Sequence, residues 1–142
     1  MNKTFSGLIA DDEIETIRLS TNKGLIGYRI KKFECIFQNP AGLTAEAIMK
    51  VYTVKPDATD GIISFNDPTL IGAAFLENNS SSSYFGGKTI VFENVTFNQD
   101  IYITYEDNGA GHACNYYLEL EQINLHLNEA TVATLKDMRG TE

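Results

Sequence analysis

Residues 27–38 read GYRIKKFECIFQ, and this stretch decides the fold class. In its second half, apolar and charged side chains occupy alternate positions. The alternating residues are Lys32, Phe33, Glu34, Cys35 and Phe37. A period of two is typical of a β-strand that buries one face and exposes the other. Asn39-Pro40 then ends the stretch, because proline cannot donate a hydrogen bond to a ladder. We therefore expect a long strand over residues 27–38.

The rest of the chain repeats this pattern in short runs separated by turn residues. The runs expected to form strands are Lys3–Ile9, Ile14–Leu19, Glu46–Val54, Gly61–Phe65, Leu70–Leu76, Lys88–Phe97, Asp100–Tyr105 and Ala113–Leu127. Strands at turn spacings of about 8–12 residues indicate an all-β fold, an antiparallel β-sandwich with a jelly-roll-like arrangement.

Two finer predictions concern the second half of the chain. Lys88–Phe97 and Asp100–Tyr105 are expected to form a hairpin around Asn98-Gln99. Ala113–Leu127 changes the parity of its apolar residues at Glu121-Gln122, where we expect a β-bulge. The polar run at residues 78–83 is expected to be an exposed loop tip.

The C-terminal residues depart from the β pattern. Asn128 is a good N-cap residue, and apolar side chains then recur every third position at Val132, Leu135 and Met138. We expect a β-sandwich domain over residues 1–127, with a short α-helix and tail over residues 128–142, in a single domain overall. A helix of about 11 residues is too short to persist alone in water, so its apolar stripe must dock on its own sheet or on another subunit.

Composition and charge exclude several classes of protein. The 142 residues are 43% hydrophobic and carry a net charge of −8, which fits one globular domain. The charge is uneven, because residues 56–135 hold eleven anions and one cation, Lys88. Such a surface disfavours nucleic acid. No apolar run is long enough to span a membrane. The first residues lack the apolar run of a secretory signal, so we expect synthesis in the cytosol.

The sequence offers little chemistry. His112 lies in a glycine-containing turn, but no nucleophile motif accompanies it. Cys35 and Cys114 lack the spacing of zinc ligands and are expected to be free buried thiols, with a disulfide between them as the alternative. We expect no enzyme activity, no cofactor and no resident metal, although the acidic turns at residues 57–60 and 106–108 leave a hard cation as an alternative.

Two segments are candidates for a ligand face. Tyr84 and Phe85 place aromatic rings beside the polar run 78–83, and His112 belongs to the turn at residues 106–112. Aromatic rings beside an exposed loop are one way in which a β-sandwich binds a carbohydrate or a receptor.

Several segments together resemble a protein family. They are Ser6-Gly7-Leu8, Ile17-Arg18-Leu19, Gly27-Tyr28-Arg29-Ile30, Tyr116–Gln122 and Leu127–Gly140. In these segments the chain is similar to small structural proteins of aquatic tailed bacteriophages. The resemblance covers about half of the chain and is strongest at its two ends. It implies a non-enzymatic virion component, either a capsid decoration or cement protein or a minor capsid protein. It assigns chemistry to no residue.

These observations predict a virion protein that works through protein–protein contacts. Its expected partners are the major capsid protein or other virion proteins, together with further copies of itself in a homo-oligomer, with a trimer favoured. The candidate assembly contacts are Val132, Leu135 and Met138. The alternative function is a carbohydrate- or receptor-binding module on a phage fibre or a cell surface, with Tyr84, Phe85 and His112 on its ligand face.

Overall fold

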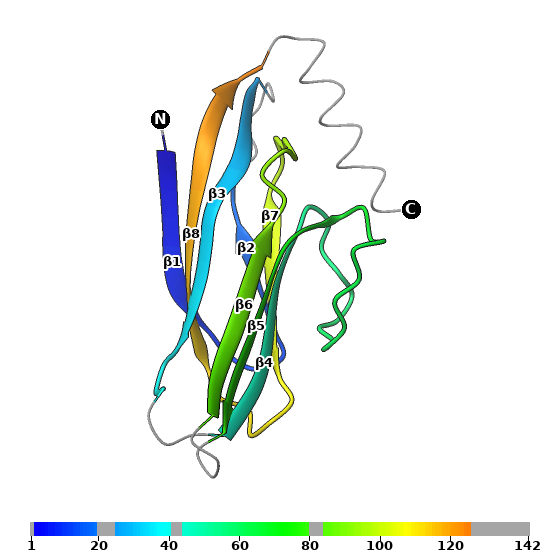
Figure 1. Cartoon of the computed structure of the whole chain (residues 1–142). Coiled ribbons are helices and arrows are strands. Elements are labelled where there is room, and N and C mark those ends of the chain that lie inside the picture. Colours follow the sequence, from blue (N-terminus) through cyan, green and yellow to red (C-terminus); the bar gives the residue numbers. More distant parts are fainter. Residues whose placement is uncertain (1, 20–24, 41–43, 80–83, 126–142) are drawn as a thin grey trace.

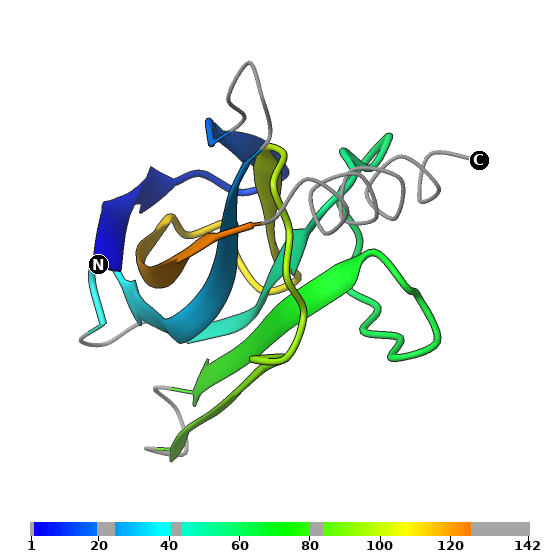
Figure 2. The same ribbon diagram turned by 90° about the horizontal axis from the view of Figure 1, so that it is seen from above.

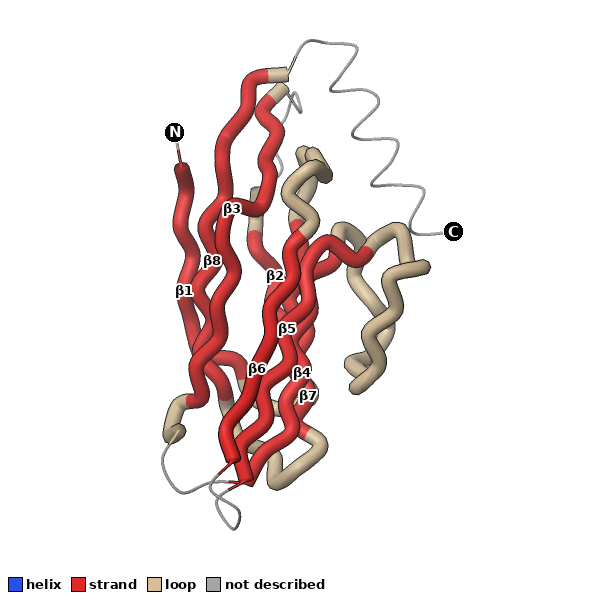
Figure 3. Tube along the Cα trace, viewed as in Figure 1, coloured by secondary structure: helices blue, strands red, loops and turns tan. Residues whose placement is uncertain are grey.

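The computed structural model of the chain describes residues 2–19, 25–40, 44–79 and 84–125. These residues form eight strands and no helix (Figures 1 and 3). The strands are β1 (Asn2–Ile9), β2 (Glu13–Ile17), β3 (Ile26–Phe37), β4 (Thr44–Tyr52), β5 (Leu70–Asn79), β6 (Tyr84–Val91), β7 (Ile101–Asp107) and β8 (Cys114–Asn124). The predicted all-β fold is confirmed. The helix expected after Asn128 lies outside the described residues. Within the described residues, the structure has no helix that could span a membrane.

The strands form two antiparallel sheets that pack against each other (Figure 1). One sheet has three strands in the order β1-β8-β3, and the other has five in the order β2-β7-β4-β5-β6. The pairing is nested, because β4 pairs with β5, β2 with β7, and β1 with β8. The chain therefore winds like one long hairpin folded over on itself, with its first and last described strands side by side.

A complete nesting would also pair β3 with β6, but β6 stays at the edge of the five-stranded sheet. The connection that follows β6 takes its place beside β3. Tyr28 and Phe97 exchange two backbone hydrogen bonds, with N–O distances of 2.8 and 3.0 Å, and their rings stack with centroids 6.3 Å apart. This bridge seals one side of the sandwich over a fully buried Phe97.

The core lies between the two sheets and is filled by the inward-facing residues of both. The three-stranded sheet contributes residues such as Ile30, Phe33 and Leu118, and the five-stranded sheet contributes Met49 and Ile103, all nearly or fully buried. The predicted alternation in residues 32–37 is confirmed, since Lys32 and Glu34 are exposed and Phe33 and Phe37 are buried.

The β-bulge predicted at Glu121-Gln122 is wrong, because the irregularity lies in the neighbouring strand. Ile30 pairs with Leu120 and Lys32 pairs with Glu119, which leaves Lys31 as the extra residue in β3. A bulge shifts the parity of its own strand. Tyr28 and Ile30 therefore face inward before it, and Phe33 and Phe37 face inward after it.

Two other strand predictions are also wrong. Gly61–Phe65 is part of a long connection between β4 and β5 and forms no strand. The segments around Asn98-Gln99 do not form a hairpin, because β6 pairs with β5 while β7 lies between β2 and β4. Of the expected loop at residues 78–83, Asn78 and Asn79 belong instead to β5, and residues 80–83 lie outside the described ranges.

Candidate interaction surface

The connection between β4 and β5 is the largest irregular segment among the described residues. It covers residues 53–69 and lies on the outer face of the five-stranded sheet, away from the three-stranded sheet (Figures 1 and 2). Its two ends meet, because Thr53 N–H donates to the Thr69 carbonyl at 2.9 Å. A compact surface loop with closed ends is an Ω-loop, a structure that is frequently functional. We call residues 53–69 the Ω-loop.

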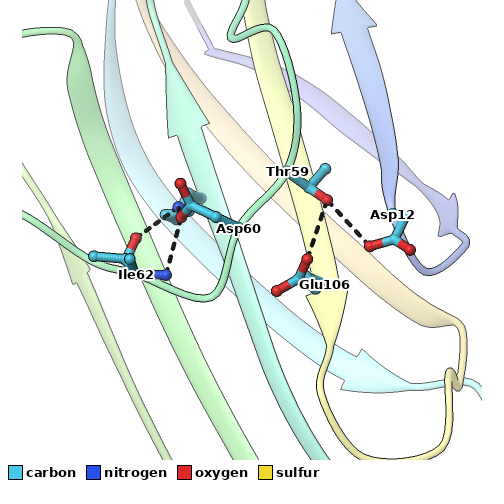
Figure 4. A network of polar contacts seen from close by, with 6 residues as sticks. Asp12, Thr59, Asp60, Ile62 and Glu106 are labelled. Carbon is cyan, nitrogen blue, oxygen red and sulfur yellow. Dashed lines mark hydrogen bonds and ion pairs between the residues drawn. The ribbon is translucent and has the colours of Figure 1, made fainter.

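Lys50 is the first anchor of the Ω-loop. Its side chain projects from the outer face of β4, and Nζ donates to Asp60 Oδ1 and to the Ile62 carbonyl, each at 2.6 Å. Asp60 Oδ1 also accepts the Ile62 N–H at 2.9 Å (Figure 4). Burial by itself lowers the pKa of Lys50, but the hydrogen bonds to Asp60 and Tyr52 outweigh it and the pKa is raised. The hydrogen bond from Lys50 lowers the pKa of Asp60. Both shifts favour the charged pair.

Thr59 is the second anchor. Its hydroxyl lies 3.2 Å from Asp12 Oδ1 and 3.4 Å from Glu106 Oε1, so that the Ω-loop meets the β1–β2 turn and β7 at one point (Figure 4). Asp12 adopts a left-handed backbone conformation with φ of 62° in this turn. Burial, and then the neighbouring Asp12 carboxylate, raise the pKa of Glu106. Asp11 adds to the negative charge there.

The Ω-loop turns its polar groups inward at these anchors and its apolar side chains outward. Ile62 is 70% exposed, Phe65 58% and Ile63 38%. Phe65 is held by an edge-to-face contact with Phe92, with ring centroids 5.4 Å apart (T-shaped packing).

Two more exposed apolar side chains lie on the sheet next to the Ω-loop. Phe75 on β5 and Ile90 on β6 share the outer face with Lys50, because Lys50 pairs with Ala73, which pairs with Ile90. The resulting Ω-loop surface consists of Ile62, Ile63, Phe65, Phe75 and Ile90. Exposed apolar side chains gathered in this way mark interaction sites in soluble proteins.

The sequence predicted other residues as the site. Tyr84 and Phe85 begin β6, but their side chains are outside the described part of the molecule. His112 lies in the turn after β7. The register places this turn and the start of β6 at the same end of the five-stranded sheet, three strand spacings or about 14 Å apart. The structure therefore does not bring the two parts of the expected ligand face into contact. Val132, Leu135 and Met138 lie outside the described residues.

His112 is held by its backbone within a structural turn. Its N–H donates to Asp107 Oδ2 at 2.8 Å, and its carbonyl accepts the Tyr105 hydroxyl at 2.6 Å. Asp107 Oδ1 accepts the N–H groups of Glu46 and Gly109 as well. A buried carboxylate with three backbone donors organises the turn.

The two cysteines lie on neighbouring strands, and both are free thiols. Cys35 pairs with Tyr116, and Phe37 pairs with Cys114, so that the two thiols are diagonal neighbours on the inner face. Cys114 is fully buried, and Cys35 Sγ lies 3.4 Å from Met49 Sδ. Among the described residues, no group of three or more His, Cys, Asp or Glu side chains is placed to hold a metal ion.

Sequence reasoning missed the Ω-loop because residues 61–65 combine apolar residues in the manner of a short strand. The signal that marks them as a loop is their flanks. Pro56 and Pro68 bracket the segment together with three aspartates. Proline and aspartate are typical turn residues, so their presence on both sides of residues 61–65 favours a loop.

Comparisons with known proteins find matches among solved structures only. No model of a protein family matches the chain, and no curated protein matches it. Among solved structures, the chain is similar to one in the acid-stable capsid of Helicobacter pylori bacteriophage KHP30. The identity is 10% and the TM-score 0.30, covering 87% of this chain and 99% of that one.

Two other similar structures are a tailspike and a capsid protein. The tailspike protein gp49 of Acinetobacter baumannii bacteriophage Fri1, a capsular polysaccharide depolymerase, is 7% identical with a TM-score of 0.20, covering 79% of this chain and 21% of that one. The decameric BFDV capsid protein is 8% identical with a TM-score of 0.21, covering 84% and 98%. Similarities at these scores assign neither fold family nor function.

Proposed function

We propose that this chain is a non-enzymatic structural component of a virus particle that works by binding other proteins through the Ω-loop surface. The observation that carries the proposal is the exposure of Ile62, Ile63 and Phe65 on an anchored loop. These apolar side chains are exposed on a loop that two polar anchors and a closed base hold in place. A loop fixed in this way loses little conformational entropy when it binds.

Two further arguments favour a virion as the setting. The nested pairing of β1 with β8, β2 with β7 and β4 with β5 is the winding of a jelly roll, an architecture found in viral capsid and lectin domains. Three of the five segments that carry the sequence resemblance to small virion proteins of aquatic tailed bacteriophages lie in β1, β3 and β8, which form the three-stranded sheet. The finer assignment is a capsid decoration or cement protein, or a minor capsid protein.

The partners in this proposal are the major capsid protein or other virion proteins, with further copies of the chain in a homo-oligomer, for which a trimer is favoured. The Ω-loop surface supplies one contact. The stripe of Val132, Leu135 and Met138 supplies a second apolar contact in the sequence beyond the described residues.

Quantitative mass spectrometry of purified particles tests the virion assignment. The chain should be present in many copies per particle, in a fixed ratio to the major capsid protein. Particles that lack the chain should bind the purified protein, while Ile62→Asp should not bind. Ala110→Asp, which adds the same charge at an exposed turn outside the Ω-loop surface of Ile62, Ile63, Phe65, Phe75 and Ile90, is the matched control. Absence of the chain from purified particles would refute the assignment.

The second candidate function is a carbohydrate- or receptor-binding module. The observation in its favour is that the turn containing His112 and the start of β6 with Tyr84 and Phe85 share one end of the five-stranded sheet. A glycan array separates the two functions. Specific binding that is lost in the Tyr84→Ala variant, by a chain that is absent from particles, would favour the second function.

A further inference from the structure

The molecule has a second exposed apolar cluster, on the side opposite the Ω-loop. Leu8 on β1 and Ile36 on β3 are 44% and 63% exposed. Both pair with Asn115 on β8, so they flank it on the outer face of the three-stranded sheet. We call the outer face of β1, β8 and β3, on which Leu8 and Ile36 are exposed, the three-stranded face. Because the outer faces of a two-layer sandwich point in opposite directions, the two apolar clusters cannot serve one partner molecule at one contact.

The charges around the two clusters differ in balance. Of the charged residues on β1, β3 and β8, Lys3 pairs with the buried Leu120 and so has inner-face parity, which leaves three cations and three anions for the outer face. They are Arg29, Lys31, Lys32, Glu34, Glu119 and Glu121. The strands of the five-stranded sheet and the Ω-loop together carry three cations and nine anions. One of these cations, Lys50, is buried against Asp60 and presents no charge to a partner.

Lys31 and Lys32 are the cations best placed to meet an acidic partner. Their ion pairs with Glu121 and Glu34 are long, at 3.9 and 3.8 Å, and the lysine side chains are 44% and 53% exposed. Such surface pairs contribute little and exchange readily for other partners. The three-stranded face therefore offers an apolar cluster on a face of balanced charge that has two weakly paired lysines, and the Ω-loop surface offers an apolar cluster within an acidic surface.

We infer that the Ω-loop surface of one copy binds the three-stranded face of a second copy, with Ile62 and Phe65 against Leu8 and Ile36. The inference rests on the proposed function only in taking the Ω-loop surface as a protein-binding surface. Because the two contacting surfaces differ, the contact is head-to-tail, and it produces a closed ring or an open chain of subunits. The apolar contact holds the copies together, and the opposite charges orient their encounter.

Sedimentation of the purified full-length chain tests this contact. The wild type should self-associate with increasing concentration, and more strongly at about 0.05 M than at about 0.5 M salt, because screening weakens the attraction. Ile62→Asp and Ile36→Asp should each sediment at the monomer mass of 15.7 kDa. Both side chains are exposed, so both variants should keep the wild-type circular dichroism spectrum. Ala110→Asp should associate as the wild type does.

Mixing the two defective variants provides the decisive measurement. The Ile62→Asp chain keeps an intact three-stranded face, and the Ile36→Asp chain keeps an intact Ω-loop surface. A head-to-tail contact therefore predicts that the mixture forms a species of twice the monomer mass, although neither variant does so alone. A mixture that stays monomeric, or a wild type that is monomeric at all concentrations, would overturn the inference. Either result leaves the virion assignment intact, because particle mass spectrometry measures that separately.

Discussion

The ammonium of Lys50 and the carboxylate of Asp60 meet in unequal surroundings. The lysine side chain is 2% exposed, whereas the aspartate side chain is 60% exposed. Removal of either partner breaks the same ion pair, but only the removal of Asp60 leaves a buried charge, the Lys50 ammonium, without a counterion. A buried charge that loses its partner costs far more than an exposed one.

This inequality predicts different effects for the two substitutions. Asp60→Ala should lower the free energy of unfolding by about 2 kcal/mol, since the buried ammonium loses its carboxylate partner and keeps only neutral partners, the Ile62 carbonyl and Tyr52. Lys50→Met should cost less than about 1 kcal/mol, because the Asp60 carboxylate remains hydrated. Urea denaturation of both variants measures the difference.

The double variant is the control for this comparison. Once Lys50 is methionine, Asp60→Ala should have a much smaller effect on stability, limited to the hydrogen bond that Asp60 accepts from the Ile62 N–H. If the two substitutions are equally costly and additive, the pair is an ordinary surface contact and the anchor assigned to Lys50 is wrong.

Replacement of Thr104 by valine should make the folded protein more stable. It lies beside Lys50 on the outer face and is 1% exposed, and its hydroxyl has no hydrogen-bond partner among the described residues. Thr104→Val keeps the shape and removes the buried polar atom, so the melting temperature should rise by about 2–4 °C. A fall in melting temperature would mean that a bound water molecule satisfies the hydroxyl.

The Glu106 carboxyl should make the stability of the folded protein depend on pH, in a definite direction. The folded chain raises the pKa of this carboxyl above its ordinary value of 4.5, chiefly through burial and then through Asp12. The folded state therefore binds this proton more tightly than the unfolded state does. The associated stability is present at acid pH and is lost as the pH rises through the raised pKa.

Glu106→Gln should remove that loss, because glutamine stays neutral. The variant should match the wild type near pH 4 and become progressively more stable than it toward pH 7. Urea denaturation of both proteins across this range gives the difference directly. Thr59→Ala, which keeps both carboxylates, should retain the wild-type trend, and a constant difference between Glu106→Gln and wild type would contradict the assigned cause.

The two cysteines should react slowly in the folded protein. A hydrogen bond with Cys114, followed by burial, raises the pKa of Cys35 well above its ordinary value of 9.0, and Cys114 is fully buried. Thiolate is the reactive form. Labelling with an aromatic disulfide reagent should therefore proceed only as fast as the protein unfolds, whereas immediate labelling of both thiols would exclude the inward placement.

Local alternation predicted the fold class well because each strand buries one face. The faces of residues 32–37 follow from their sequence alone. The bulge was assigned to the wrong strand because the change of apolar parity at Glu121-Gln122 is not accompanied by an extra residue in β8, whose register with β3 is unbroken over residues 120–124. The adjacent Lys31 and Lys32 between Ile30 and Phe33 were the local signal for β3.

The pairing of strands and the candidate site depend on contacts between distant residues. Nothing in residues 88–105 indicates that β6 and β7 lie on opposite sides of β4 and β5. The anchors of the Ω-loop likewise join Thr59 to Asp12 and Glu106, which are each 47 positions away. Sequence periodicity carries no information about such contacts, so the Ω-loop surface could not have been derived from it.

The nested pairing also sets the order in which the chain can fold during synthesis. The β4–β5 hairpin needs only neighbouring residues, so it can form early. The three-stranded sheet has β8 at its centre, between β1 and β3, and thus has no hydrogen-bonded ladder until β8 has left the ribosome. Before that point β1 and β3 have no partner strand in this sheet, and their apolar faces stay exposed. A nascent chain stalled before Cys114 should therefore be the species most dependent on chaperones.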